Sequence, residues 1–251
     1  MEKMNPFEYQ FSKNIGKNLT YGKTPEQISE IFFKDMLLTP KEIEGKTILV
    51  AGCGNGKLLV GLSRYNCFIT GVDLNIQVAK NNCFGLKNVC IYKIDIKKFK
   101  GYYDYIYCVG VLHHTPNPKE YFNQLVKNLK PNGKIFILIY EKQRLSLLRK
   151  LKPYKWNQNN LLLFCKLFAF ITFPIYKLIK HNKKPFRSYI NHLFDALCCE
   201  YQKSIKKEEI KLWFEENKLI FKQIVKERYL GTFKKNKING GKDEIKDRRY
   251  N

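Results

Sequence analysis

Three glycines that alternate with other residues follow a short apolar run near the start of the chain. In the stretch Ile48 to Lys57, written ILVAGCGNGK, these are Gly52, Gly54 and Gly56. Glycine has no side chain to collide with a ligand, and it adopts backbone conformations that other residues rarely take. A strand that runs into such a loop ahead of a helix lets backbone amides approach a bound group closely. The stretch therefore predicts a ligand-binding turn.

A carboxylate follows the next apolar run, in the sequence TGVDL, where Asp73 ends the predicted second strand. A carboxylate at this place in a doubly wound sheet can accept hydrogen bonds from both hydroxyls of a ribose. The ligand is therefore expected to be a nucleoside derivative. A dinucleotide is disfavoured because Lys57 stands where the third glycine of that fingerprint would fall, and the sequence has no Walker phosphate loop.

The elements that must position these residues can be read from apolar runs between residues 46 and 140. The runs TILVA, CFITGV, VCIYKI, YIYCVGV and KIFILIY are typical of strands buried on both faces of a parallel sheet. The segments KLLVGLSRY, NIQVAKNNCFG and NPKEYFNQLVKNLK have helical spacing, and the last is expected to end at Pro131-Asn132-Gly133. This alternation predicts an α/β fold with a doubly wound, mostly parallel, Rossmann-like sheet.

Further helices are predicted on both sides of this core. Thr24, Pro25 and Gln27 form a capping box, which indicates a helix before the first strand. Near the other end, SIKKEEIKLWFEENK is predicted to be a helix capped at Ser204, and LIFKQIVKERY is predicted to be a strand. The inward-facing residues of that helix are expected to be Ile205, Ile210, Trp213 and Phe214.

The segment LLLFCKLFAFITFPIYKLI, residues 161–179, is apolar and rich in aromatic residues, but Lys166, Pro174 and Lys177 interrupt it. A membrane-spanning helix needs about 20 apolar residues with few or no charges. We interpret the segment as part of a helical insertion that covers the acceptor site. Peripheral contact of residues 161–179 with a membrane, and a true span, are the alternatives.

Charge and cysteine content leave the kind of partner open. The net charge is +24, which would suit nucleic acid or another anionic surface. However, the lysines are spread along the chain, and Asn, Ile, Tyr and Phe are frequent too, as an AT-rich coding sequence would produce. The eight cysteines show no CxxC spacing, which predicts free thiols in a reducing compartment and no metal site. Because the polar start MEKMNPFEYQ leads into no apolar segment, we expect a cytoplasmic protein.

Residues 46–140 resemble the core of class I S-adenosylmethionine-dependent methyltransferases. Four separated signals occur in the family's order: AGCGNG, TGVDL, KIDIKKF, and a long stretch from YDYIYCVGVLHH to LKPNGKIFILIY. The resemblance implies S-adenosylmethionine as cofactor and an enzyme that transfers its methyl group. It also implies a seven-stranded sheet with helices on both faces and a helical insertion after the fifth strand.

The resemblance also implies which residues bind the cofactor. The glycine loop would wrap the methionine moiety, Asp73 would hold the ribose, Leu74 would pack on the adenine, and Asp95 with Ile96 would read its amino group. The predicted cofactor-binding residues are Gly52, Cys53, Gly54, Gly56, Asp73, Leu74, Asp95, Ile96, Gly110 and Val111. Structural roles remain alternatives: the glycines as plain turns, Asp73 as a helix cap and Asp95 as a turn residue. One departure is Val50, where the family commonly has an acidic residue.

Candidate acceptor residues follow the fourth and fifth predicted strands. His113 and His114 lie in the loop after the fourth strand, at the edge where α/β sheets bind ligands. Histidine can take a proton near neutral pH, so His114 is the candidate general base. His113, His114, Tyr140 and Arg144 are the predicted substrate-binding residues; Phe168, Phe170, Phe173, Arg187 and Tyr189 are further candidates, each as readily part of a core.

The sequence after the fourth strand also bears on the acceptor. Val109-Gly110-Val111-Leu112 lacks the proline-containing loop typical of enzymes that methylate nucleic-acid amino groups, and Cys108 has no proline before it. The run VGVLHHTPNP and the aromatic insertion look like bacterial small-molecule methyltransferases of the quinone and secondary-metabolite branch. We therefore predict an O-, N- or C-methyltransferase with a small, lipophilic or glycan-linked acceptor. RNA methylation and a non-catalytic binding module are the alternatives; the oligomeric state is left open.

The predicted organisation has five parts. These are an N-terminal helical cap (1–45), the cofactor-binding core (46–140), the helical insertion (141–203), the last helix and strands (204–235), and a basic flexible tail (236–251).

Overall fold

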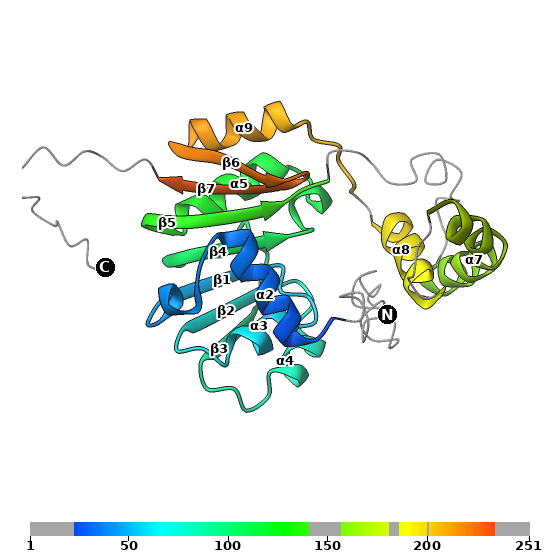
Figure 1. The fold of residues 1–251 in the computed structure, drawn as a ribbon, viewed down its shortest axis with the longest axis horizontal. Helices are drawn as coiled ribbons and strands as arrows, with labels where there is room; N and C mark the ends of the chain where they lie inside the picture. The colour runs from blue at the N-terminus through cyan, green and yellow to red at the C-terminus, as the bar shows by residue number, and fades with distance from the viewer. Residues whose placement is uncertain (1–22, 141–156, 181–185, 200, 234–251) are drawn as a thin grey trace, which may run out of the picture.

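The computed structural model describes residues 23–140, 157–180, 186–199 and 201–233, and these ranges contain one seven-stranded sheet (Figure 1). Its strand order is β3-β2-β1-β4-β5-β7-β6, in which β7 alone runs antiparallel to the other six strands. The strands are β1 Thr47–Ala51, β2 Phe68–Asp73, β3 Val89–Lys93, β4 Tyr103–Val109, β5 Leu129–Leu138, β6 Leu219–Val225 and β7 Arg228–Phe233. The predicted doubly wound, mostly parallel, Rossmann-like sheet is confirmed.

Helices cover both faces of the sheet. The helical elements are α2 Pro25–Met36, η2 Pro40–Ile43, α3 Lys57–Leu62, α4 Gln77–Asn82, η3 Leu112–His114, α5 Pro118–Lys127, α7 Gln158–Lys180, α8 Phe186–Cys198 and α9 Lys207–Glu216. Successive side chains of a strand point to opposite faces. Accordingly Leu49 of β1 lies in the apolar cluster beneath α5 and α9, whereas Ile48 lies in the cluster beneath α2 and α3. Because both faces are buried, the parallel strands read as continuous apolar runs.

Helix α2 begins as the sequence predicts. The Thr24 hydroxyl accepts a hydrogen bond from the Gln27 amide at 3.4 Å, and the Gln27 side chain accepts one from the Thr24 amide at 3.0 Å. These reciprocal bonds satisfy amides that have no partner within the first turn. Phe32 and Met36 are fully buried against the sheet. The helix is therefore an integral part of one layer of the fold.

Three predicted element boundaries are wrong. Helix α9 begins at Lys207 with Lys206 as its N-cap, so Ser204 does not cap it, because Ile205 is drawn into the core ahead of the helix. The segment LIFKQIVKERY is not one strand, since β6 ends at Val225 and β7 starts at Arg228 after a tight reversal. Helix α5 ends at Lys127, and Pro131-Asn132-Gly133 lies within β5, beside an irregularity in its pairing with β4.

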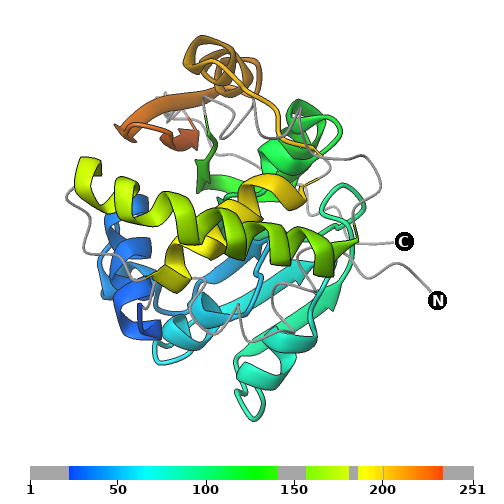
Figure 2. The same cartoon turned by 90° about the vertical axis from the view of Figure 1, so that its right-hand side faces the viewer.

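Helices α7 and α8 form a hairpin that lies beyond the carboxyl ends of the parallel strands (Figure 1). Seen from the carboxyl ends of the parallel strands, α7 is outermost and α8 lies between it and the sheet (Figure 2). The hairpin has its own apolar cluster, which includes Leu161, Cys165, Leu193 and Phe194. The insertion is therefore helical as predicted, and it packs chiefly on itself.

One helix in the described part of the chain, Asn159–Leu178, is long and apolar enough to cross a membrane by length and composition. Only 22% of its most apolar stretch of 18 residues is buried, whereas the core helix of a globular domain is mostly buried.

Candidate functional site

The glycine loop connects β1 to α3 and has an unusual backbone. The φ angles of Gly52, Gly54 and Gly56 are 77°, 54° and 77°, a region that disfavours residues with a Cβ atom. The amides of Gly52 and Cys53 both donate to the carbonyl of Val72 in β2, at 2.8 and 3.1 Å. The loop is thus folded back over the end of the neighbouring strand.

Gly52, the first glycine of the loop, lets this loop pack closely against the loop after β4. A Cβ atom on Gly52 would lie 2.2 Å from Cγ2 of Val111, which no side chain could tolerate without a shift. Gly110, the residue before Val111, has a φ angle of 73°, and a Cβ atom there would meet no atom within 4 Å. The two loops therefore touch at Gly52 and Val111, while the backbone of Gly110 borders open space.

Asp73 lies at the carboxyl end of β2, beside the glycine loop. Its Oδ2 accepts a hydrogen bond from the Gly54 amide at 2.9 Å, and its Oδ1 accepts one from the Asn75 amide at 3.0 Å. Burial raises the pKa of this carboxyl group, although the amides of Asn75, Gly54 and Leu74 oppose that effect by stabilising the anion. Each carboxylate oxygen has capacity for a second hydrogen bond, as two ribose hydroxyls would require.

Two neighbours of Asp73 have the environments expected around an adenine. Leu74 follows directly and is 52% exposed, an unusual degree for a large apolar side chain next to a buried strand end. Ile96 lies after β3 and is 6% exposed, packed into the cluster under α5. Leu74 is therefore the exposed apolar side chain available to a flat ring at this end of β2, whereas Ile96 is buried in the core.

Asp95 has a structural role, that of a turn residue. Its Oδ1 accepts a hydrogen bond from the Lys97 amide at 2.8 Å, and its Oδ2 accepts one from the Tyr121 hydroxyl at 2.9 Å. These bonds make it a turn residue that ties the segment after β3 to α5. A bond from an adenine amino group would use the remaining acceptor capacity of the same carboxylate.

The two histidines of the β4 loop differ in exposure. His113 is fully buried, and its ring centre lies 4.1 Å from that of His114 and 4.4 Å from that of Tyr140. His114 is half-buried and reaches the surface of the loop. Of the pair, His114 is therefore the one that an acceptor can approach, while His113 supports the rings of His114 and Tyr140.

The chain that returns from α8 fixes the orientation of His114. The backbone carbonyl of Tyr201 lies 2.9 Å from Nδ1 of His114, and Sγ of Cys199 lies 3.9 Å from its Nε2. A carbonyl oxygen only accepts hydrogen bonds, so Nδ1 carries the proton and the neutral ring has its lone pair on Nε2.

The same returning segment binds the histidine loop at two further points. The Lys203 amide donates to the carbonyl of His113 at 2.9 Å, and Nζ of Lys203 donates to the carbonyl of Pro116. Sequence reasoning missed Tyr201 and Lys203, since both act through bonds between distant parts of the chain. Their only sequence signal is their position at the end of the predicted insertion.

The acceptor candidates in the insertion have mixed positions. Phe168 and Phe173 are half-buried, and the ring of Phe173 lies 5.6 Å from that of Tyr189 on α8. Phe170 is 77% exposed on α7, and Arg187 is exposed on α8. Phe173 and Tyr189 thus pack on each other between the two helices, and Phe168 stacks on Phe164 within α7. Arg144, the remaining predicted acceptor residue, lies outside the described residues, as do residues 1–22 and 234–251.

Val50, which departs from the family pattern, is 4% exposed within the cluster under α2 and α3. It pairs with Gly71 of β2 and Tyr107 of β4. The side chain points into an apolar layer, where an unpaired carboxylate would be costly. This accounts for a valine at the position and leaves the amino end of the cofactor to the glycine loop.

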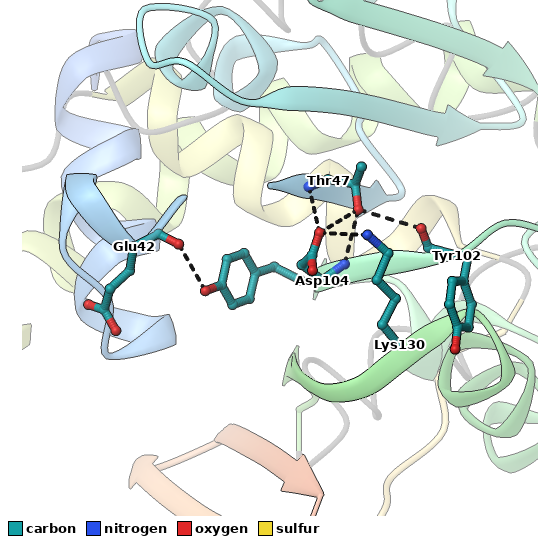
Figure 3. Close-up of polar contacts among 6 residues, drawn as sticks. Glu42, Thr47, Tyr102, Asp104 and Lys130 are labelled. Atoms are coloured by element: carbon teal, nitrogen blue, oxygen red, sulfur yellow. Dashed lines mark hydrogen bonds and ion pairs between the residues drawn. The ribbon is translucent and has the colours of Figure 1, made fainter. Parts of the chain in front are cut away.

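A polar cluster with a structural role lies at the amino ends of the central strands, opposite the glycine loop (Figure 3). Oδ2 of Asp104 accepts hydrogen bonds from the Thr47 amide at 2.9 Å, the Thr47 hydroxyl at 2.8 Å and Nζ of Lys130 at 2.8 Å. Burial alone would raise the pKa of Asp104, but Lys130 and Thr47 together hold it below its usual range. These bonds join the amino ends of β1, β4 and β5.

Comparison with known proteins identifies a family whose fold matches the sheet and loops described above. Residues 26–174, more than half of the chain, match a family model described as a methyltransferase domain. The fold is that of the class I S-adenosylmethionine-dependent methyltransferases. The chain belongs to the methyltransferase domain family, whose cofactor is S-adenosylmethionine.

Two curated relatives carry the same printed name, ubiquinone biosynthesis O-methyltransferase. The protein from Coxiella burnetii is 31% identical over 105 residues, which cover 38% of this chain and 43% of that protein. The protein from Escherichia coli O127:H6 is 30% identical over 100 residues, covering 37% and 42%. The matched part is thus less than half the length of these relatives.

Solved structures agree on the fold. Magnesium protoporphyrin IX methyltransferase from Synechocystis PCC 6803 with bound S-adenosylmethionine has a TM-score of 0.57 at 11% identity, covering 93% of this chain and 100% of that one. The same enzyme with bound S-adenosylhomocysteine gives 0.54 at 12% identity, covering 90% and 97%.

The residues at the carboxyl edge fit this cofactor. The bare backbone of the glycine loop, the carboxylate of Asp73 and the exposed side chain of Leu74 suit a methionine moiety, a ribose and an adenine in that order. When bound, S-adenosylmethionine supplies an activated methyl group on a sulfonium.

Proposed function

We propose that this chain transfers the methyl group of S-adenosylmethionine to a small lipophilic acceptor, with a hydroxyl oxygen favoured over nitrogen or carbon. The observation that carries this is the environment of His114, whose Nδ1 is held by the Tyr201 carbonyl at the edge where the cofactor residues meet. The names of the curated relatives support an oxygen acceptor. The aromatic insertion over the same edge supports a lipophilic one.

The chain's own residues contribute alignment and proton removal. The glycine loop and Asp73 position the cofactor together with Gly110, and His114 in the same loop as Gly110 contacts the acceptor on the opposite side of the methyl group. Such in-line placement, with water excluded by the insertion, supplies most of the rate enhancement in a transfer of this kind. His114 takes the proton from the acceptor hydroxyl through Nε2, because its Nδ1 is committed to the carbonyl, and the hydroxyl displaces the Cys199 thiol that lies 3.9 Å from Nε2.

The first test of the cofactor is titration calorimetry of the purified chain with S-adenosylmethionine, S-adenosylhomocysteine and, as a control, NAD. We expect micromolar binding of the first two and none of NAD. Transfer of a radioactive methyl group into the lipid fraction of a bacterial extract then tests the acceptor class. Transfer into RNA instead, with RNA binding that falls steeply with salt, would favour the alternative suggested by the net charge of +24.

The role of His114 is tested by His114→Asn. An asparagine amide can still donate to the Tyr201 carbonyl, but it has no nitrogen that accepts a proton. We expect kcat to fall by roughly 10²- to 10⁴-fold, with unchanged affinity for S-adenosylhomocysteine and loss of the rising acid limb of the rate profile. An unchanged kcat would remove the histidine from the chemistry, and weakened cofactor binding would make it a positioning residue.

A further inference from the structure

The outward side of α7 carries a continuous apolar surface. Six large side chains along about four turns of the helix are between 56% and 77% exposed: Leu163, Leu167, Phe170, Ile171, Ile175 and Leu178. At 3.6 residues per turn, they and Pro174 lie within an arc of roughly 140°. Scattered exposed apolar residues are ordinary, but a contiguous set of this size marks an interaction surface. We call these residues the α7 stripe.

Helix α7 has two other sides, and these limit what the stripe can bind. One side, with Leu161, Cys165 and Ala169, is buried against α8. Between this side and the stripe lie Lys166 and Lys177, both exposed. A single helix that crosses a bilayer is in contact with lipid on all sides. Helix α7 instead has one exposed apolar side, one side with two lysines and one side that packs on α8. That division is typical of a helix that lies in the plane of a membrane surface.

The charge around α7 indicates which membrane surface fits. Residues 141–156, which precede the helix, contain six Lys or Arg residues and one acidic residue. Residues 180–187, which follow it, contain four Lys or Arg residues and no acidic residue. Basic segments beside an apolar helix face are attracted to anionic lipid headgroups. A second copy of this chain, with net charge +24, would bring the same positive segments together.

We propose that the α7 stripe inserts into the surface of a bilayer that contains anionic lipids, with Lys166 and Lys177 at the headgroups. Helix α7 is the outermost element over the edge that holds the cofactor residues (Figure 2). Docking by this side therefore turns the carboxyl edge of the sheet toward the membrane. The inference concerns attachment and does not depend on the identity of the acceptor atom.

The test is co-sedimentation of the full chain with vesicles of phosphatidylcholine alone and with vesicles in which a quarter of the lipid is phosphatidylserine. We expect at least tenfold tighter binding to the second kind, weakened by salt. Phe170→Ser with Ile171→Ser should lower this binding at least tenfold. The control is Leu212→Ser with Ile220→Ser, which removes two apolar side chains that are 54% and 49% exposed on α9 and β6, away from α7 (Figure 1).

Unchanged affinity of the Phe170→Ser and Ile171→Ser variant for the anionic vesicles would overturn the proposal. So would a chain that ignores vesicles but sediments as a dimer that this variant dissociates, because a second copy would then cover the stripe. Vesicle-bound protein that resists alkaline carbonate would show a span instead of surface attachment. Affinity for S-adenosylhomocysteine, measured on each variant, separates loss of docking from loss of the fold and from failure of the proposed methyl transfer.

Discussion

At the scale of single residues, Asp73 combines two tasks that are usually discussed apart. It holds the glycine loop through the Gly54 amide, and in the proposed site the remaining capacity of the same oxygens binds the ribose. A carboxylate that lacked the first task would leave the loop free to move. In the proposed site, cofactor binding and loop geometry are therefore coupled through one side chain.

For Asp73→Ala we expect affinity for S-adenosylmethionine to weaken by roughly 1–3 kcal/mol, the scale of lost hydrogen bonds to a charged group. Titration calorimetry measures this directly. Asp104→Ala is the matched control, since it removes a similarly bonded carboxylate from the opposite edge of the sheet (Figure 3). The control should lower the melting temperature and leave cofactor affinity alone. Equal affinities for wild type and Asp73→Ala would refute the ribose assignment.

At the scale of elements, several turns use residues other than glycine in the left-handed region. Lys218, between α9 and β6, has a φ angle of 59°, and its amide donates to the carbonyl of Glu215 at 2.9 Å. Its side chain is exposed. The conformation costs a residue with a Cβ atom roughly 1–2 kcal/mol, part of which glycine would recover.

Lys218→Gly should therefore stabilise the fold by about 0.5–1 kcal/mol in urea denaturation, after the greater freedom of glycine in the unfolded chain is subtracted. Lys218→Ala keeps the Cβ atom and should give no gain. A gain of equal size in both variants would point to removal of the lysine charge, and the backbone explanation would fail.

The sequence predicts correctly those elements whose signals are local. The strands of the core follow from apolar runs, and α2 follows from its capping box, because both signals are local. The reversal between β6 and β7 was missed since Glu227, with a φ angle of 64°, occupies a position where glycine or asparagine would have been the signal. The bonds from Tyr201 to His114 join residues 87 positions apart, so no local pattern could reveal them.

At the scale of the whole molecule, a buried ion pair joins the two ends of the described chain. Nη1 of Arg228 in β7 lies 2.6 Å from Oδ2 of Asp35 in α2, and the Tyr107 hydroxyl of β4 donates to the same oxygen at 2.7 Å. Burial raises the pKa of Asp35 in spite of these partners. The carboxylate thus depends on both neighbours to remain ionised inside the fold.

Arg228→Met should destabilise the protein by about 3–5 kcal/mol, because it leaves a buried carboxylate without its counterion. Adding Asp35→Leu should restore part of the loss, since it removes the uncompensated charge but leaves the buried Tyr107 hydroxyl without its acceptor. Chemical denaturation of both variants measures the difference. If the double variant is no more stable than Arg228→Met, the ion pair does not explain the effect.

The α7–α8 hairpin carries its own apolar cluster, and Cys199, Tyr201 and Lys203 in the segment that follows it contact the histidine loop. Such a part can change its sequence without disturbing the layers of the sheet. Under the proposed function, the acceptor preference of this architecture can therefore evolve by exchange of one module, provided that the returning segment still reaches the histidines.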